Sequence, residues 1–316
     1  MSIKHSGFAI LSTLASLALL AAAGAALAQD APRTLFINVH VFDGVQEQRI
    51  ENANVLVEGN LIKTVSTDPI EAHGATVIDG GGRTLMPGLI DAHWHMFNPL
   101  TIQDVMTAHL AYNHAKIAVE AEKTLLRGFT TIHEPGGNSF GLKRAIDEGI
   151  LVGPRILPSG APISQTSGHF DFAQPWEPPK RLGGQPSRPE RYGMLRVVDG
   201  ADDALAAARF NLKHGTDFRF DPASNGVQAS QLARFGKWLS NVEMLRLITS
   251  ENARLLELRD ERHPYREGPL GVIREGAYAD ILLVDGNPLD DVSILGDGGK
   301  HFPLIMKNGV IYKNTL

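Results

Sequence analysis

Cysteine is absent from this sequence of 316 residues. A disulfide framework, a thiol nucleophile and a thiolate metal site are therefore excluded, and any bound metal must use His, Asp, Glu or a modified Lys. A basic excess is also lacking, because 35 acidic residues outnumber 30 Lys and Arg. Nucleic-acid binders need a basic face that displaces counterions, so we expect no nucleic-acid partner. The hydrophobic share of 43% is typical of a globular chain with a large core.

A long hydrophobic run lies at the start of the chain. Lys4 precedes an apolar stretch over residues 8–23, and Ala26-Leu27-Ala28 forms an A-x-A site. This pattern is typical of a secretory signal peptide, here residues 1–28. An uncleaved anchor is the alternative, but the run is near the shorter end for a membrane span. We therefore expect a secreted protein, in a bacterial periplasm, with no stable membrane anchor after cleavage.

Strand signals are concentrated at the two ends of the remaining chain. Residues 34–86 and 265–316 contain short apolar runs separated by Gly, Asn and Asp turns, a pattern typical of small sheets. The C-terminal runs are GVIREG, ADILLVDGNP and PLIMKNGVIYK. Residues 87–264 mix strand and helix patterns, with helices expected at 104–126, 202–212 and 240–258. We expect a β-sandwich domain built from both termini (34–86 plus 265–316) with an α/β domain (87–264) inserted.

The clearest chemical signal is the segment PGLIDAHWH, residues 87–95. A strand from Leu89 to His95 would place His93 and His95 on one face, because side chains alternate along a strand. Two imidazoles at one strand end can bind a single divalent metal. An isolated H-x-H pair also occurs by chance, but this pair directly follows PGLID. His93 and His95 are therefore our candidate metal ligands.

PGLIDAHWH resembles the first-strand motif of the amidohydrolase superfamily, whose members are metal-dependent hydrolases on a TIM-type barrel. Further segments resemble the family in the same order: GFTT (128–131), GPRI (153–156), SGH (167–169), ENARLL (251–256) and LGVIREGAYADI (270–281). GPRI and SGH resemble the imidazolonepropionase-like and Xaa-Pro dipeptidase-like branch. The resemblance implies hydrolysis of a carbon–nitrogen bond in a small-molecule substrate, a cyclic amide or a dipeptide, by metal-activated water.

The resemblance also implies a cofactor and further site residues. The cofactor is a divalent metal, zinc foremost, with manganese or iron as alternatives. Family members carry an acid/base carboxylate that also binds metal at the end of the eighth strand, and Asp217 is the one candidate for it here. The alternative for Asp217 is a turn residue after a helix. His169 in SGH is a candidate substrate contact, with an ordinary loop histidine as the alternative.

The length of the inserted domain conflicts with a complete barrel. A TIM barrel needs about 250 residues and seldom fewer than about 200, whereas the stretch from His93 to Leu258 is shorter. It has room for about five or six βα units, so we expect a truncated TIM-type (β/α) barrel of the α/β class. We place the deficit near residues 211–219, as an internal deletion of roughly 100 residues or more.

Two hypotheses about activity follow from this deficit. The first is a metal-dependent hydrolase of carbon–nitrogen bonds. The second is a catalytically impaired remnant of such an enzyme, because no residue matches the family's middle-strand His ligands or bridging Lys. In TTIHEPG, His133 stands where this branch more often has Arg or a small residue. We interpret it as an ordinary strand-end residue, with a position at the mouth of the site as the alternative. A homo-oligomer is compatible with the sequence.

Overall fold

The computed structural model describes residues 31–212, 238–258 and 263–316. The chain divides into two units, Met1–Pro32 and Arg33–Leu316, and the second contains every element named below. The expected signal peptide, residues 1–28, lies outside the described residues and stays a prediction. Within the described ranges, no helix combines the length and the apolar character needed to cross a membrane.

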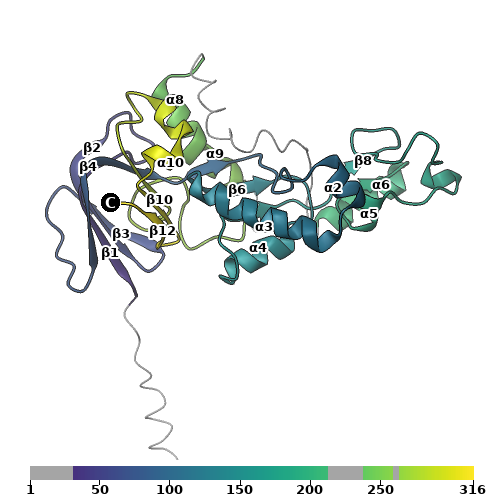
Figure 1. Cartoon of the computed structure of the whole chain (residues 1–316). Coiled ribbons are helices and arrows are strands. Elements are labelled where there is room, and N and C mark those ends of the chain that lie inside the picture. Colours follow the sequence, from purple (N-terminus) through teal and green to yellow (C-terminus); the bar gives the residue numbers. More distant parts are fainter. Residues whose placement is uncertain (1–30, 213–237, 259–262) are drawn as a thin grey trace, which may run out of the picture. The chain divides into compact units, whose positions relative to one another are not determined.

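Strands from both ends of the chain form one seven-stranded sheet (Figure 1). The N-terminal strands are β1 (Arg33–Val41), β2 (Ile50–Glu58), β3 (Leu61–Ser66) and β4 (Thr76–Pro87). The C-terminal strands are β10 (Ile281–Val284), β11 (Leu304–Lys307) and β12 (Val310–Asn314). The order is β12-β11-β10-β4-β1-β2-β3, and only the pair β1 and β4 is parallel.

Both sets of strands contribute to a common hydrophobic core. Phe36, Val55 and Leu85 from the N-terminal strands pack in one cluster with Ile281 and Leu304 from the C-terminal strands. Burial of alternate side chains on one face of each strand is what the strand patterns predict. The sandwich form, which needs two packed sheets, and the domain boundaries stay predictions.

The expected strand GVIREG, residues 271–276, is wrong. The structure has turns and irregular backbone there. Gly271 and Gly276 adopt φ values of 70° and 78°, and this left-handed conformation is incompatible with a regular strand. Of the two other C-terminal runs, ADILLVDGNP contains β10 and PLIMKNGVIYK forms the hairpin of β11 and β12.

A second sheet of three parallel strands begins directly after β4. Its strands are β5 (Leu89–Asp91), β6 (Phe129–Glu134) and β7 (Arg155–Pro158), in that order. Helix α3 (Leu110–Leu126) connects β5 to β6, and α4 (Phe140–Asp147) connects β6 to β7. These connections are the βα units of the expected barrel. The described residues contain no closed barrel, so the number of units and the internal deletion stay predictions.

The remaining elements are short. They are α2 (Ile102–Thr107), β8 (Ile163–Ser164), η1 (Lys180–Leu182), α5 (Arg188–Arg191), β9 (Arg196–Val197), α6 (Ala201–Leu212), α8 (Asn241–Arg246), η4 (Leu247–Glu251), α9 (Asn252–Glu257), η6 (Val292–Gly296) and α10 (Gly298–His301). β8 and β9 pair in parallel. The expected helix at 202–212 is confirmed as α6.

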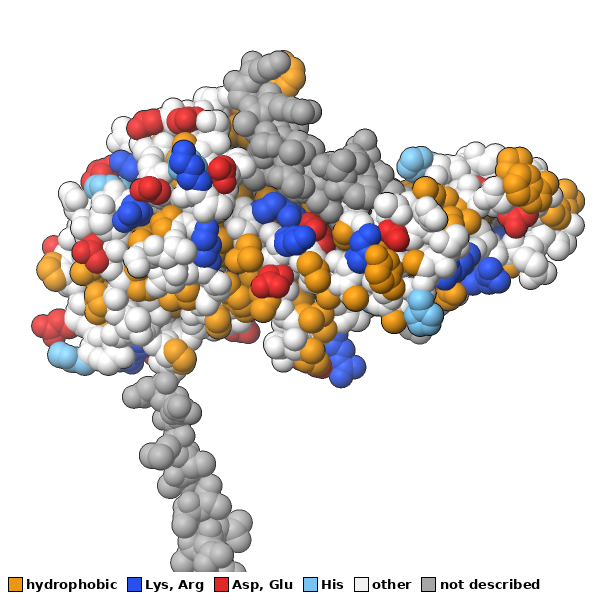
Figure 2. Space-filling view, in the orientation of Figure 1, with side chains coloured by type: hydrophobic (Ala, Val, Ile, Leu, Met, Phe, Trp, Pro, Cys, Tyr) orange, Lys and Arg blue, Asp and Glu red, His pale blue; other side chains and the backbone are white. Residues whose placement is uncertain are grey.

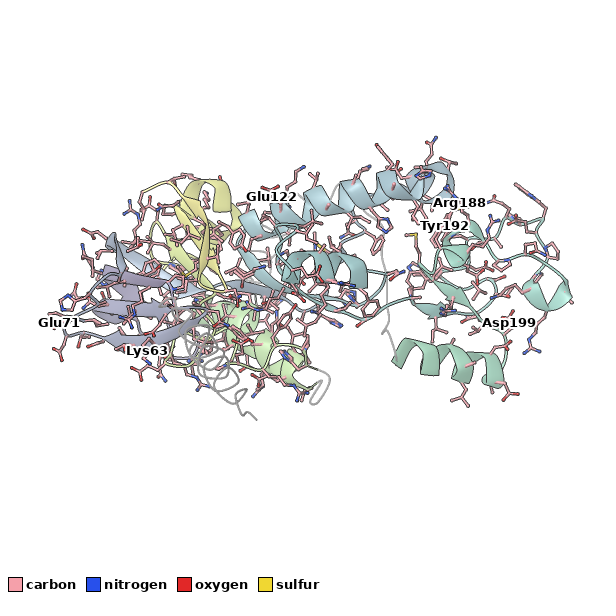
Figure 3. All side chains as sticks on the ribbon, turned by 90° about the horizontal axis from the view of Figure 1, so that it is seen from below. Lys63, Glu71, Glu122, Arg188, Tyr192 and Asp199 are labelled. Carbon is pink, nitrogen blue, oxygen red and sulfur yellow. The ribbon has the colours of Figure 1, made fainter. Side chains whose placement is uncertain are left out.

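The single helix expected at 104–126 is wrong, because the chain forms α2 and α3 there. Ala108 and His109 have extended backbone, and His109 Nδ1 accepts the N–H of Ala111 to start a new helix. The Ala108 carbonyl instead accepts a hydrogen bond from Arg188 on α5. Arg188 stacks over the ring of Tyr192, and Figure 3 shows both side chains beside the start of α3.

The helix expected at 240–258 is confirmed, with one π-helical turn, η4, between α8 and α9. Ser240 and Glu243 cap its start through reciprocal side-chain and backbone hydrogen bonds. Leu245 packs in the core cluster that contains Leu89 of β5. Asn252 Nδ2 donates to the carbonyl of Ile90 at 2.8 Å. This helix therefore lies against the first parallel strand.

A buried ion pair joins the two sheets. Arg155 begins β7 and pairs with Asp280, which precedes β10, and both side chains are only 4% exposed. Arg155 Nη2 also donates to Asn308 Oδ1 at 2.6 Å, and its guanidinium carbon lies 4.1 Å from the ring centroid of Tyr278. Asp280 Oδ1 accepts the Asn308 N–H at 2.8 Å. These bonds satisfy both charges within the protein.

We expect Arg155→Met to lower the free energy of unfolding by about 3–5 kcal/mol, because Asp280 is left buried without its cation. Urea denaturation measures the loss. The control is Arg144→Met, which removes an exposed pair with Glu148 on α4 and should cost about 0.5 kcal/mol or less. Equal losses in the two variants contradict the prediction.

Lys307 of β11 gives the junction a pH dependence. Burial lowers the pKa of Lys307 from 10.5 to about 8, with a contribution from Arg155, and its Nζ donates to the Gly153 carbonyl at 2.6 Å. Between pH 8 and 10.5 the unfolded chain carries a proton that the folded chain lacks. The free energy of unfolding of the unmodified chain, minus that of Lys307→Met, should therefore rise by about 1.4 kcal/mol per pH unit in that window. Urea unfolding of both proteins at about pH 7 and about pH 10 checks this, and a constant difference contradicts it.

Candidate metal centre

His93 and His95 lie close together, but not on a strand. β5 ends at Asp91, so the strand expected from Leu89 to His95 is wrong. The Asp91 carboxylate accepts the His93 N–H at 2.9 Å and turns the chain out of the sheet. The two imidazole centroids are 5.2 Å apart with the rings nearly perpendicular. His93 is exposed and His95 is buried. A loop at the end of β5 thus brings the two candidate ligands together, and their metal-binding role stays a prediction.

Glu134, the last residue of β6, holds this loop from the neighbouring strand. Its carboxylate is fully buried, with Oε1 2.9 Å from His95 Nδ1. Oε2 accepts the Met96 N–H at 2.6 Å, and Oε1 also accepts the Gly136 N–H at 3.3 Å. Burial raises the pKa of Glu134, and the hydrogen bonds from His95 and the backbone act in the opposite direction. Three N–H groups therefore converge on one buried carboxylate.

The contact with Glu134 sets the tautomer of His95. When Glu134 is ionised, its carboxylate only accepts hydrogen bonds, so the proton of a neutral His95 imidazole then lies on Nδ1 and the lone pair lies on Nε2. Metal-binding histidines are oriented by carboxylates in this way. The chemistry of His93 and His95 therefore fits a divalent metal of the zinc, manganese or iron type.

His133 connects the ends of all three parallel strands. It lies in β6, its Nδ1 is 2.8 Å from the Ala92 carbonyl after β5, and its Nε2 is 2.8 Å from Ser159 Oγ after β7. A carbonyl only accepts, so Nδ1 carries the proton and Nε2 accepts from the Ser159 hydroxyl. The Trp94 N–H also donates to the His133 carbonyl at 3.0 Å. His133 is thus a strand-end residue, as expected, with a clear role in holding the loop.

The two other predicted site residues are Asp217 and His169. Asp217 lies outside the described residues, so its acid/base and metal-binding roles stay predictions. His169 is exposed on the loop after β8, and its ring packs against Phe170 with centroids 4.7 Å apart. Its substrate role also stays a prediction. Across residues 31–212, 238–258 and 263–316, no three or more His, Cys, Asp or Glu are grouped to hold a metal.

Comparison with known proteins decides the family. The model of the amidohydrolase family matches residues 84–259, more than half of the chain. The chain belongs to the amidohydrolase family. Ochratoxinase of Aspergillus niger is 30% identical over 245 residues, which cover 73% of this chain and 47% of ochratoxinase. The chain thus spans about half the length of this curated amidohydrolase-family relative.

Solved structures show the same amidohydrolase fold. A crystal structure of an amidohydrolase superposes with a TM-score of 0.76 at 23% identity and covers 90% of this chain and 100% of that one. A prolidase complexed with N-methylphosphonate-L-proline superposes with a TM-score of 0.66 at 20% identity and covers 89% of this chain and 100% of that one. The α/β fold class is therefore confirmed.

Sequence reasoning missed Glu134 in this amidohydrolase-family chain. Only the histidine of the segment TTIHEPG was considered, although this segment also contains Glu134. The available signal was an acidic residue at the end of the strand that follows the H-x-H segment in the chain. In a parallel sheet that strand end lies beside the end of the first strand, which carries the H-x-H pair.

We expect Glu134→Gln to weaken zinc binding by about 10- to 100-fold, because the amide no longer holds His95 with a charged acceptor. A competition titration with a chromogenic zinc chelator measures the affinity. Glu120→Gln is the matched control, since Glu120 is another buried carboxylate, which lies on α3 and pairs with Arg127 at the C-cap of that helix. Equal zinc affinities for the two variants contradict the positioning role of Glu134.

Proposed function

We propose that this chain is a metal-dependent hydrolase that cleaves a carbon–nitrogen bond in a small-molecule substrate. The observation that carries the proposal is the Glu134 carboxylate, which orients His95 beside His93 at the carboxyl ends of parallel strands. Active sites of barrel enzymes lie at these strand ends. Membership of the amidohydrolase family supports the same reaction class. The similarity to a prolidase favours a peptide-like bond, and a cyclic amide is the alternative.

The proposed metal ligands are His93, His95 and Asp217, with zinc as the first choice and manganese or iron as alternatives. A metal bound there would lower the pKa of a water molecule and polarise the substrate carbonyl. Glu134 keeps the proton on His95 Nδ1, and His133 with Ser159 holds the loop that carries both imidazoles. We propose that Asp217 takes the proton of the attacking water and passes it to the leaving nitrogen. His169 is the proposed substrate contact.

Secretion into a bacterial periplasm is part of the proposal. It is supported by the basic residue, apolar run and A-x-A site of residues 1–28. The substrate would then be a small molecule that reaches this compartment. A homo-oligomer also remains part of the proposal.

The competing proposal is a remnant that binds metal but has lost catalysis. The observation that favours it is length, because the matched region covers only 47% of ochratoxinase. Two histidines without further ligands would bind a metal weakly, and an incomplete barrel would lack substrate contacts. Metal affinity and turnover, measured on the same protein, separate the two proposals.

The test is to measure bound metal and hydrolysis with the full chain. We expect about one zinc per chain by elemental analysis and cleavage of at least one substrate in a panel of Xaa-Pro dipeptides and lactams, followed by chromatography. His93→Ala and His95→Ala should each lower zinc affinity by at least about 100-fold and abolish turnover. His73→Ala, a change at an exposed loop histidine, should leave both unchanged.

The possible outcomes distinguish the hydrolase from the remnant and also test the metal centre itself. Stoichiometric zinc with turnover that depends on His93 and His95 supports the hydrolase. Weak zinc binding through the same two residues, without turnover on any substrate, supports the remnant. Zinc binding that is unchanged in both variants rejects the metal centre itself.

A further inference from the structure

Helices α3 and α4 enclose a pocket of about 300 Å³. Ile117 and Ala118 line it from α3, and Leu142 and Ala145 line it from α4. A volume of this size lies at the lower end of the range of small-molecule pockets. Figure 2 shows hydrophobic side chains gathered on the face that these two helices form. The pocket can therefore hold a small apolar group.

Phe97 is one of the residues that line this pocket. Its ring packs against Gly137, where a Cβ atom would come within 2.4 Å of the ring, and Gly137 has a φ of 130°. Any side chain at residue 137 would displace the Phe97 ring. Glycine at this position therefore allows the Phe97 ring to keep its place in the lining of the pocket.

The residues that line the same pocket include Ser139, whose hydroxyl is buried. Ser139 is only 1% exposed and occupies the N-cap position of α4, where its side chain makes no capping hydrogen bond. Among the residues that the structure describes, Ser139 Oγ has no hydrogen-bond partner. An unsatisfied buried hydroxyl is destabilising, so such groups usually have a ligand or water as a partner.

The charge around Ser139 favours an anion. The first-turn N–H groups of an α-helix carry partial positive charge, and Ser139 lies at this end of α4. His114 and Asn138 also line the pocket and add hydrogen-bonding capacity. The lining contains no Asp or Glu. It also contains none of His93, His95 and Glu134, so it is distinct from the candidate metal centre.

We propose that this pocket binds a small carboxylic acid with an apolar body. The carboxylate accepts the Ser139 hydroxyl and faces the N-terminus of α4, and the apolar body lies between Ala118 and Ala145. This ligand site does not depend on the proposed hydrolase activity. It places a second small-molecule site beside the two loops that carry the metal centre, because Phe97 and Ser139 follow them in the chain.

The probe for the test is 3-phenylpropionate, titrated by calorimetry into the full chain after removal of metal with EDTA. We expect one binding site per chain. Ala145→Leu and Ala118→Leu each fill the pocket and should weaken binding by at least about tenfold. Ser139→Ala removes the hydroxyl and should weaken binding by at least about tenfold, because hydrogen bonds to charged groups are stronger than those between neutral groups. The matched control is Ala115→Leu, on an exposed position of α3, which should bind as the unmodified chain does.

Thermal unfolding of each variant shows that loss of binding is not loss of the fold. Failure of the unmodified chain to bind the acid overturns the proposal. Undiminished binding by both pocket-filling variants also overturns it. Binding that requires added zinc, or that is lost in His95→Ala, would mean that the acid binds at the metal centre, and this too overturns the proposed site.

Discussion

The buried carboxylate of Glu134 is the constraint on which the candidate site depends. A carboxylate without solvent is costly unless donors surround it, and here His95, Met96 and Gly136 supply three N–H groups. Those donors come from the loops after β5 and β6. Satisfying Glu134 therefore fixes both loops at once, and it also fixes which nitrogen of His95 is protonated. The two loops are held in place because the buried carboxylate of Glu134 would be destabilising without its donors.

A second buried charge that needs a partner, that of Asp280, helps to hold the two sheets together. Gly88 is the crossing point where β4 of the large sheet continues into β5 of the parallel sheet, and a Cβ there would come within 2.2 Å of the Thr130 side chain. The Gly88 N–H donates to the Asp280 carbonyl, next to the carboxylate that pairs with Arg155. A backbone crossing and a buried ion pair thus place β5 and β7 against the sheet built from both termini. This junction therefore also positions the ends of β5 and β7, which His93 and Ser159 follow.

The sequence predicted the features that depend on local pattern. The strands at both ends, the helix from Asn241 to Glu257 and the closeness of His93 and His95 all follow from periodicity or from a contiguous motif. It failed where side chains compete with regular backbone. Asp91 accepts the His93 N–H and ends β5 early, and His109 starts a new helix where one continuous helix was expected. Glu134 was missed because its role depends on which strand lies beside β5, a non-local fact that periodicity does not contain.

The proposed metal binding by His93 and His95 does not require a complete barrel. Glu134 ends β6, His93 and His95 lie in the loop after β5, and the donors to Glu134 lie in the loops after these two strands. The contact that holds His95 beside His93 therefore needs only β5, β6 and the loops that follow them. Catalysis needs more, since a proton-accepting carboxylate and substrate contacts come from other strand ends in this kind of barrel. A chain that spans about half of its curated relative can thus keep the first part of the site intact, while its turnover depends on whether residues such as Asp217 complete it.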